Sequence, residues 1–125
     1  MHENELSYSI RGAAFKVHAA LGPGLLESSY EAALACELEE LGFQTRTQVG
    51  LPLVYKSIRL DIGYRIDLLV NEKVIVEIKS VEALNDVHRK QLLTYLKLSG
   101  KKLGLLINFN VLNLKNAIER IVNNL

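Results

Sequence analysis

Cysteine, long apolar runs and net charge are all scarce in this sequence. The single cysteine, Cys36, excludes an internal disulfide and any zinc or iron-sulfur site built from the cysteines of one chain, and it indicates a cytoplasmic setting. No stretch approaches the roughly eighteen uninterrupted apolar residues of a membrane span, and the first ten residues lack the layout of a signal peptide. We therefore expect a soluble, unprocessed protein with no membrane partner.

The formal net charge is only +1, from 15 basic and 14 acidic residues, so overall charge does not argue for a nucleic-acid partner. The charge is nevertheless uneven. Residues 1–42 hold two basic and seven acidic side chains, whereas residues 88–125 hold seven basic and one acidic. This asymmetry indicates an end of the molecule that faces a polyanion. The simpler interpretation is a solvated helix and loop surface.

The 125 residues, 49% of them hydrophobic, are enough for one core and predict a single domain over residues 1–125. Hydrophobic periodicity and capping residues predict helices over residues 5–21, 25–41, 85–99 and 114–122. Alternation predicts strands in residues 43–50, 51–60, 64–70, 73–81 and 102–109. The expected fold class is α/β or α+β, with a mixed central sheet flanked by helices.

An aspartate and a glutamate interrupt two neighbouring apolar strands. Asp67 shares a face with Arg65 and Leu69, and Glu77 projects from the same side as Lys79. If residues 71–73 form a three-residue hairpin loop, Asp67 lies opposite Glu77 with their Cβ atoms about 5 Å apart, whereas a two-residue loop breaks this register. The other face of the first strand then carries Tyr64, Ile66, Leu68 and Val70.

Two ionised carboxylates at this separation need a balancing positive charge. Their repulsion is roughly 3 kcal/mol at an effective dielectric constant near 20, so the site requires a proton, a lysine or a cation. Oxygen ligands favour Mg²⁺, with Mn²⁺ as a substitute, over Zn²⁺. The simpler interpretation is an ion pair between Lys79 and its acidic neighbours on the strand surface.

Helical spacing also places polar side chains among apolar ones. In residues 25–41, Glu27 falls inside an apolar arc, although a carboxylate in the first turn equally complements the helix dipole. In residues 85–99, Gln91 lies near the middle of an inward arc, with His88 beside Tyr95. The first arc consists of Leu26, Tyr30, Leu34, Leu38 and Leu41. The second consists of Val87, Leu92, Tyr95 and Leu98, while Arg89, Lys90 and Lys97 point away.

Three short motifs follow one another along the chain: GLLESSY at residues 24–30, Asp67 with EIK at residues 77–79, and QLLTY at residues 91–95. Together they resemble the PD-(D/E)XK nuclease superfamily. The second motif resembles its metal-binding signature, the third resembles the QxxxY motif of its RecB-like branch, and the first matches the GxxExxY motif of a family of small proteins within it. One departure is Ile66, which stands where the superfamily commonly has proline.

The resemblance implies a restriction-endonuclease-like fold and a nuclease that depends on Mg²⁺. The ion would be held by Asp67, Glu77 and the backbone carbonyl of Ile78, and Glu27 would add a carboxylate directly or through water. Lys79 is similar to the superfamily lysine that orients or activates the attacking water.

Further roles follow for residues near this core. The resemblance implies that Gln91 and Tyr95 contact nucleic acid or brace the metal site, with Gln91 counted as catalytic beside Lys79 and Glu27. We also expect substrate contacts from Tyr30 and a phosphate contact from His88. The basic C-terminal third would hold phosphates beside the metal.

Three functions remain open from the sequence. The first is a nuclease that hydrolyses phosphodiester bonds, with DNA favoured over RNA as the partner. The second is a binding or regulatory module that keeps the fold without turnover, which the small size and near-neutral charge favour. The third is a structure-selective junction endonuclease, which predicts a symmetric homodimer.

Overall fold

The computed structural model describes residues 1–60 and 63–125, and its centre is a five-stranded mixed sheet with the strand order β1-β4-β5-β6-β7. Strands β5 and β6 run parallel, and every other neighbouring pair is antiparallel. The strands are β1 (Thr45–Gly50), β4 (Arg65–Val70), β5 (Val74–Lys79), β6 (Leu103–Asn108) and β7 (Ile118–Val122). The predicted α/β class with a mixed sheet is confirmed.

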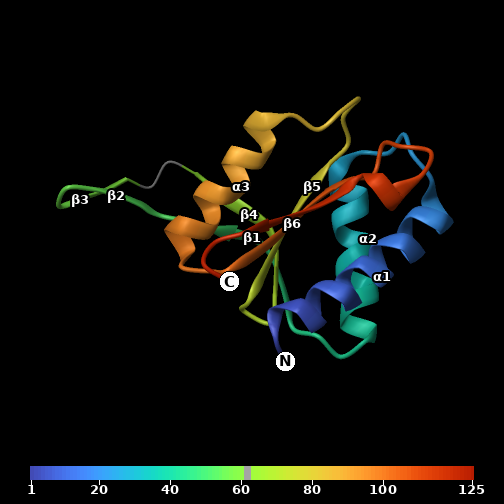
Figure 1. The fold of residues 1–125 in the computed structure, drawn as a ribbon, viewed down its shortest axis with the longest axis horizontal. Helices are drawn as coiled ribbons and strands as arrows, with labels where there is room; N and C mark the ends of the chain where they lie inside the picture. Colours follow the sequence, from blue (N-terminus) through green and yellow to red (C-terminus); the bar gives the residue numbers. More distant parts are fainter. Residues whose placement is uncertain (61–62) are drawn as a thin grey trace.

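Helices cover both faces of the sheet (Figure 1). Helices α1 (Glu3–Leu21) and α2 (Glu27–Glu40) pack against one face, and α3 (Asp86–Ser99) packs against the other. Alternate residues of β5 supply the two cores, because Val74, Val76 and Ile78 face α1 and α2 whereas Ile75 faces α3. None of the helices in the described ranges is long and apolar enough to cross a membrane.

Helix α3 forms the crossover between the parallel strands β5 and β6. The Asn85 side chain accepts hydrogen bonds from the backbone at the first turn, and Gly100 ends the helix with a φ of 72°. The helix lies close to the sheet where Leu92 packs over Gly104. A Cβ atom at Gly104 would come within 2.8 Å of Leu92 Cδ1, so a larger residue there would require the Leu92 side chain to shift.

Two predicted elements are wrong. Residues 51–60 form a hairpin of two short strands, β2 (Leu53–Tyr55) and β3 (Ile58–Leu60), because Lys56 takes a φ of 56° and turns the chain. This hairpin, which we call the arm, projects from the sheet (Figure 1). Residues 114–122 form a short 3₁₀ turn (Leu114–Asn116) followed by β7, because pairing with β6 outweighs the weak helical preference of so short a segment.

Several predicted faces also need correction. Leu26 and Leu41 are exposed because they flank α2 at its two ends, and Val87 is exposed because it lies in the first turn of α3.

Tyr64 and Ile66 do not share a core with Leu68 and Val70; they lie on the α3 side. The pairing of β1 with β4 skips Gln48 and Asp67, and Gln48 has a φ of 51°, so the alternation of β4 is interrupted there.

Candidate metal and nucleic-acid site

The hairpin of β4 and β5 brings Asp67 and Glu77 together. Val70 pairs with Val74 and Leu68 with Val76, which is the predicted register with a three-residue loop. One step further along, the Asp67 N–H donates to Glu77 Oε2 at 3.2 Å, and the Ile78 N–H donates to Asp67 Oδ2 at 2.8 Å. Each carboxylate therefore accepts a backbone hydrogen bond from the strand that carries the other.

Burial makes this pair electrostatically costly. Glu77 is only 3% exposed, and desolvation raises its pKa to about 9, helped by the hydrogen bond and the negative charge of Asp67. A glutamate with such a pKa carries a proton at neutral pH. In the metal-free protein, that proton reduces the repulsion between the two carboxyl groups.

The residues present fit a hard divalent cation. A cation can replace the proton between the two carboxyl groups, and Mg²⁺ in proteins is commonly bound through one or two carboxylates and several waters. Because the N–H and C=O of one residue in a strand point to the same neighbour, the Ile78 carbonyl is directed toward β4, where the ladder has ended. No cluster of three or more Asp, Glu, His or Cys side chains suited to a metal occurs within the described residues.

A second pair of polar residues extends the site, and the sequence did not indicate it. Gln48 Nε2 donates to Glu31 Oε1 at 2.6 Å and to Asp67 Oδ1 at 3.3 Å. Burial, together with the charge of Asp67, raises the pKa of Glu31. The positive φ of Gln48 lies at the position that faces Asp67, so this strained residue links α2 to the candidate metal ligand.

The GxxExxY motif lies at the end of β5. Glu27 is exposed, and its Oε2 accepts a hydrogen bond of 3.1 Å from the Ser80 N–H, directly after Lys79. Ser80 Oγ also donates to the Leu25 carbonyl at 2.7 Å. The structure thus brings Glu27 to the Lys79–Ser80 end of the strand, beside an open pocket of about 430 Å³.

Tyr30 has an internal position. Its side chain is fully buried and stacks on Phe109 at a ring separation of 4.6 Å. Its hydroxyl donates to the Gly22 carbonyl and accepts from the Leu25 N–H, so both functions of the hydroxyl are used. This burial contradicts a direct substrate contact. Tyr30 instead holds the turn that leads to Glu27.

Removing this hydroxyl should destabilise the protein. We expect Tyr30→Phe to lower the free energy of unfolding by about 1–2 kcal/mol, because the Leu25 N–H and the Gly22 carbonyl lose their buried partner. Urea denaturation measures the loss. The control is Tyr8→Phe, at a tyrosine that is largely exposed on α1. Equal stability of the two variants would contradict the positioning role of Tyr30.

Lys79 and Gln91 form the polar side of the site toward α3. Lys79 Nζ donates to Gln91 Oε1 at 3.3 Å. Gln91 is exposed rather than buried as predicted, because its side chain lies where α3 borders the site and not over the core. Tyr95, one turn later, is buried, and desolvation followed by the charges of Glu77 and Asp67 raises the pKa of its hydroxyl.

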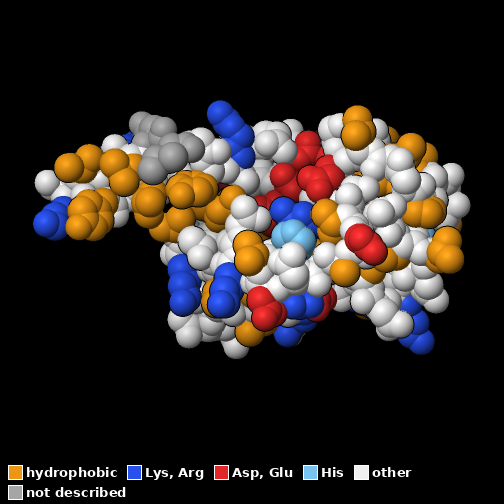
Figure 2. All heavy atoms as spheres, turned by 90° about the horizontal axis from the view of Figure 1, so that it is seen from above, with side chains coloured by type: hydrophobic (Ala, Val, Ile, Leu, Met, Phe, Trp, Pro, Cys, Tyr) orange, Lys and Arg blue, Asp and Glu red, His pale blue; other side chains and the backbone are white. Residues whose placement is uncertain are grey.

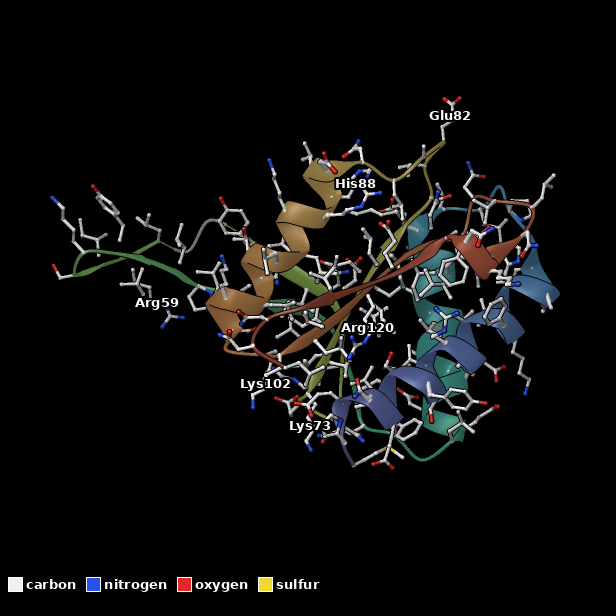
Figure 3. The ribbon with its side chains drawn as sticks, viewed as in Figure 1. Arg59, Lys73, Glu82, His88, Lys102 and Arg120 are labelled. Carbon is white, nitrogen blue, oxygen red and sulfur yellow. The ribbon has the colours of Figure 1, made fainter. Side chains whose placement is uncertain are left out.

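His88 is a capping residue in this structure. Its Nδ1 accepts a hydrogen bond of 3.2 Å from the Asn85 N–H, and the Asn85 side chain accepts in return from the His88 N–H. Figure 3 shows His88 in the first turn of α3. The second ring nitrogen, Nε2, is not part of this capping box, and a phosphate contact through it stays a prediction.

Several basic residues of the C-terminal third lie away from this site. Lys101 and Lys102 precede β6, which runs parallel to β5, so they lie at the opposite end of the sheet from Lys79. Figure 3 shows Lys102 and Lys73 at the end of the molecule away from His88. Arg89, expected to point away, pairs with Asp86 and with Glu119 of β7. The prediction that this segment holds phosphates beside the metal is therefore wrong for these residues.

A mixed sheet flanked by helices, with paired carboxylates and a lysine at the end of one strand, is the restriction-endonuclease-like architecture. The family model of the PD-(D/E)XK nuclease superfamily matches residues 4–121, so the chain belongs to this superfamily of metal-dependent nucleases. No curated protein and no solved structure matches the chain significantly.

Proposed function

We propose that this chain acts as one domain, a Mg²⁺-dependent nuclease that hydrolyses phosphodiester bonds, with DNA favoured over RNA. Within the superfamily, the motifs at residues 24–30 and 91–95 support membership of the GxxExxY family and the RecB-like branch. The observation that carries the proposal is the buried carboxyl of Glu77 against Asp67, with Lys79 two residues further along the same strand. Burying two acids in contact lowers the stability of a protein, and such strongly perturbed carboxyl groups cluster at functional sites.

In this proposal, Asp67, Glu77 and the Ile78 carbonyl hold the cation. A bound divalent cation supplies charge neutralisation at a phosphate oxygen and a more acidic water. Glu27, which already accepts a hydrogen bond from the Ser80 N–H, would add a carboxylate to the cation directly or through water. Mn²⁺ would substitute for Mg²⁺ because it prefers the same oxygen ligands.

The remaining residues orient the reactants. Lys79 directs its ammonium group to the attacking water or to a phosphate oxygen, and Gln91 fixes that group through the hydrogen bond at 3.3 Å. Tyr95, whose hydroxyl pKa is raised by burial and then by the charges of Glu77 and Asp67, braces the metal site from α3. His88 offers Nε2 to a neighbouring phosphate, while its Nδ1 caps the helix.

Removal of the metal is the direct test. We expect the purified protein to cleave DNA with Mg²⁺ or Mn²⁺ and to show no cleavage with EDTA, because without the cation Glu77 keeps a proton and neither carboxyl group can position a charged phosphate. Gel electrophoresis of labelled single-stranded and double-stranded DNA and of RNA measures the products. Cleavage that persists in EDTA, or its absence with every substrate, would contradict the proposal.

A module that binds nucleic acid without turnover is the second candidate. It is favoured by the small number of acidic ligands, since the parts of the chain that the structure describes lack a group of three or more. Calorimetric titration separates the two: a nuclease of this type binds Mg²⁺ or Mn²⁺ itself, whereas an idle module binds nucleic acid but no cation. The junction endonuclease stays a prediction. It would form a symmetric homodimer and prefer four-way DNA as its substrate.

A further inference from the structure

A cavity with aromatic and apolar walls lies between the base of the arm and α3. Its volume is about 230 Å³, and it is lined by Leu53, Tyr64, Gln91, Thr94, Tyr95 and Leu98. Figure 2 shows apolar side chains continuing along the arm to this region, on the same face as a group of acidic side chains. Of the six lining residues, only Gln91 and Tyr95 have a role in the function proposed above.

The cavity shares a wall with the candidate reaction site. Gln91 lines the cavity and also accepts the hydrogen bond from Lys79 Nζ. Tyr95, one turn after Gln91 on α3, lines it as well. A ligand in the cavity therefore lies one side chain away from the lysine that would act on a phosphate.

The walls suit a flat, partly polar ring. Tyr64 is 39% exposed, and its ring meets that of Tyr95 edge-on, at 6.3 Å and an angle of 61°. An edge-on pair leaves the faces of one ring uncovered by the other, so a planar ligand can stack there. Leu53 and Leu98 supply apolar contacts, and the Thr94 hydroxyl supplies one donor and one acceptor at the rim.

We propose that this cavity binds a single unpaired nucleobase of the substrate strand, next to the phosphodiester bond that is cut. The inference rests on the proposed nuclease function and adds the substrate class to it. The volume is below the range of about 300–1,000 Å³ that is typical of pockets for larger ligands, which favours one ring system. A base can enter only after it leaves the stack, so single strands and duplexes with an unpaired nucleotide are the expected substrates, and a continuous duplex is disfavoured.

Binding measured with Ca²⁺ in place of Mg²⁺ tests the proposal separately from cleavage. The probes are a continuous DNA duplex, the same duplex with one unpaired 2-aminopurine, and the single strand. We expect the wild type to bind the probe with the unpaired base about tenfold more tightly than the continuous duplex, as base stacking on tyrosine predicts, and to quench its fluorescence. Tyr64→Ala should lose both the preference and the quenching, whereas Tyr64→Phe should keep them.

The control variant is Tyr8→Ala, which removes an exposed tyrosine of α1 that does not line the cavity and should behave as the wild type. Equal binding of all three probes, or a preference that Tyr64→Ala retains, would overturn the nucleobase pocket while leaving the nuclease proposal intact. Loss of a dimer in Tyr64→Ala, seen by sedimentation with unchanged DNA binding, would also overturn it, because the cavity would then be a contact with a second copy. Failure to bind any of the probes, together with no metal-dependent cleavage, would overturn both proposals.

Discussion

Lys79→Ala and Asp67→Asn should each lower the Mg²⁺-dependent cleavage rate by about 10³-fold or more. Lys79 supplies the only ammonium group that the β5 strand directs beside the carboxyl pair, and groups that act on the attacking water commonly contribute 10²–10⁴-fold. Asp67→Asn keeps the shape of the side chain but removes the negative charge that a divalent cation requires. Initial cleavage rates over a range of Mg²⁺ concentrations measure both effects.

Two surface substitutions control for this experiment. Lys97→Ala removes an exposed lysine of α3, and Glu82→Gln removes an exposed carboxylate from the loop before that helix. Both should cleave at the wild-type rate, and thermal unfolding should show that all four variants are folded. Cleavage by Lys79→Ala and Asp67→Asn at the wild-type rate would mean that the reaction does not occur at this site.

Glu77→Gln should stabilise the metal-free protein while it abolishes cleavage. The pKa of Glu77 is about 9 in the folded state, above its ordinary value of 4.5. At any pH between these two values, the folded protein keeps the Glu77 proton and the unfolded chain has lost it. The free energy of unfolding therefore falls as the pH rises from about 5 to 9, by at most roughly 1.4 kcal/mol per pH unit. A glutamine keeps a hydrogen toward Asp67 at every pH and removes this loss.

Thermal unfolding in EDTA at pH 6 and pH 8 measures the difference. We expect the melting temperature of Glu77→Gln to exceed that of the wild type by about 5 °C or more at pH 8 and by less at pH 6. Mg²⁺ should raise the melting temperature of the wild type at pH 8 but not that of Glu77→Gln. The matched control is Glu40→Gln, at an exposed residue of α2. A wild type whose stability increases from pH 6 to pH 8 in EDTA would contradict the assignment.

The juxtaposition of Asp67 and Glu77 was predictable because it depends on local information. A three-residue loop between two antiparallel strands fixes their register, here with Val70 opposite Val74. Counting outward from that pair identifies the residues that face each other. The caps of α3 were predictable for the same reason, since Asn85 and Gly100 act on the backbone next to them.

The C-terminal strand could not be predicted in this way. Leu114, Ala117, Ile118, Ile121 and Val122 have helical spacing, yet β7 forms because it completes the edge of β6. That gain depends on strand pairing that helical periodicity does not report, so tertiary structure overrides the local pattern.

The link through Gln48 and Glu31 was missed for a related reason. Neither residue belongs to a motif, and they meet because β1 pairs with β4 and α2 packs beside both. The positive φ of Gln48 has no sequence signal either, since this conformation is more typical of glycine and asparagine. A polar side chain on a strand whose neighbour carries Asp67 is the one sign that could have suggested it.

The arm is inserted between two strands whose ends are already joined, since Gly50 pairs with Arg65 where it leaves the sheet. Segments added inside a closed hairpin leave the register beneath them unchanged, so this part of the chain can lengthen, shorten or be exchanged without moving Asp67 or Lys79. Chemistry and selectivity can thus diverge at separate rates during evolution, and grafting a different arm onto the same sheet is a practical route to redesigned target preference.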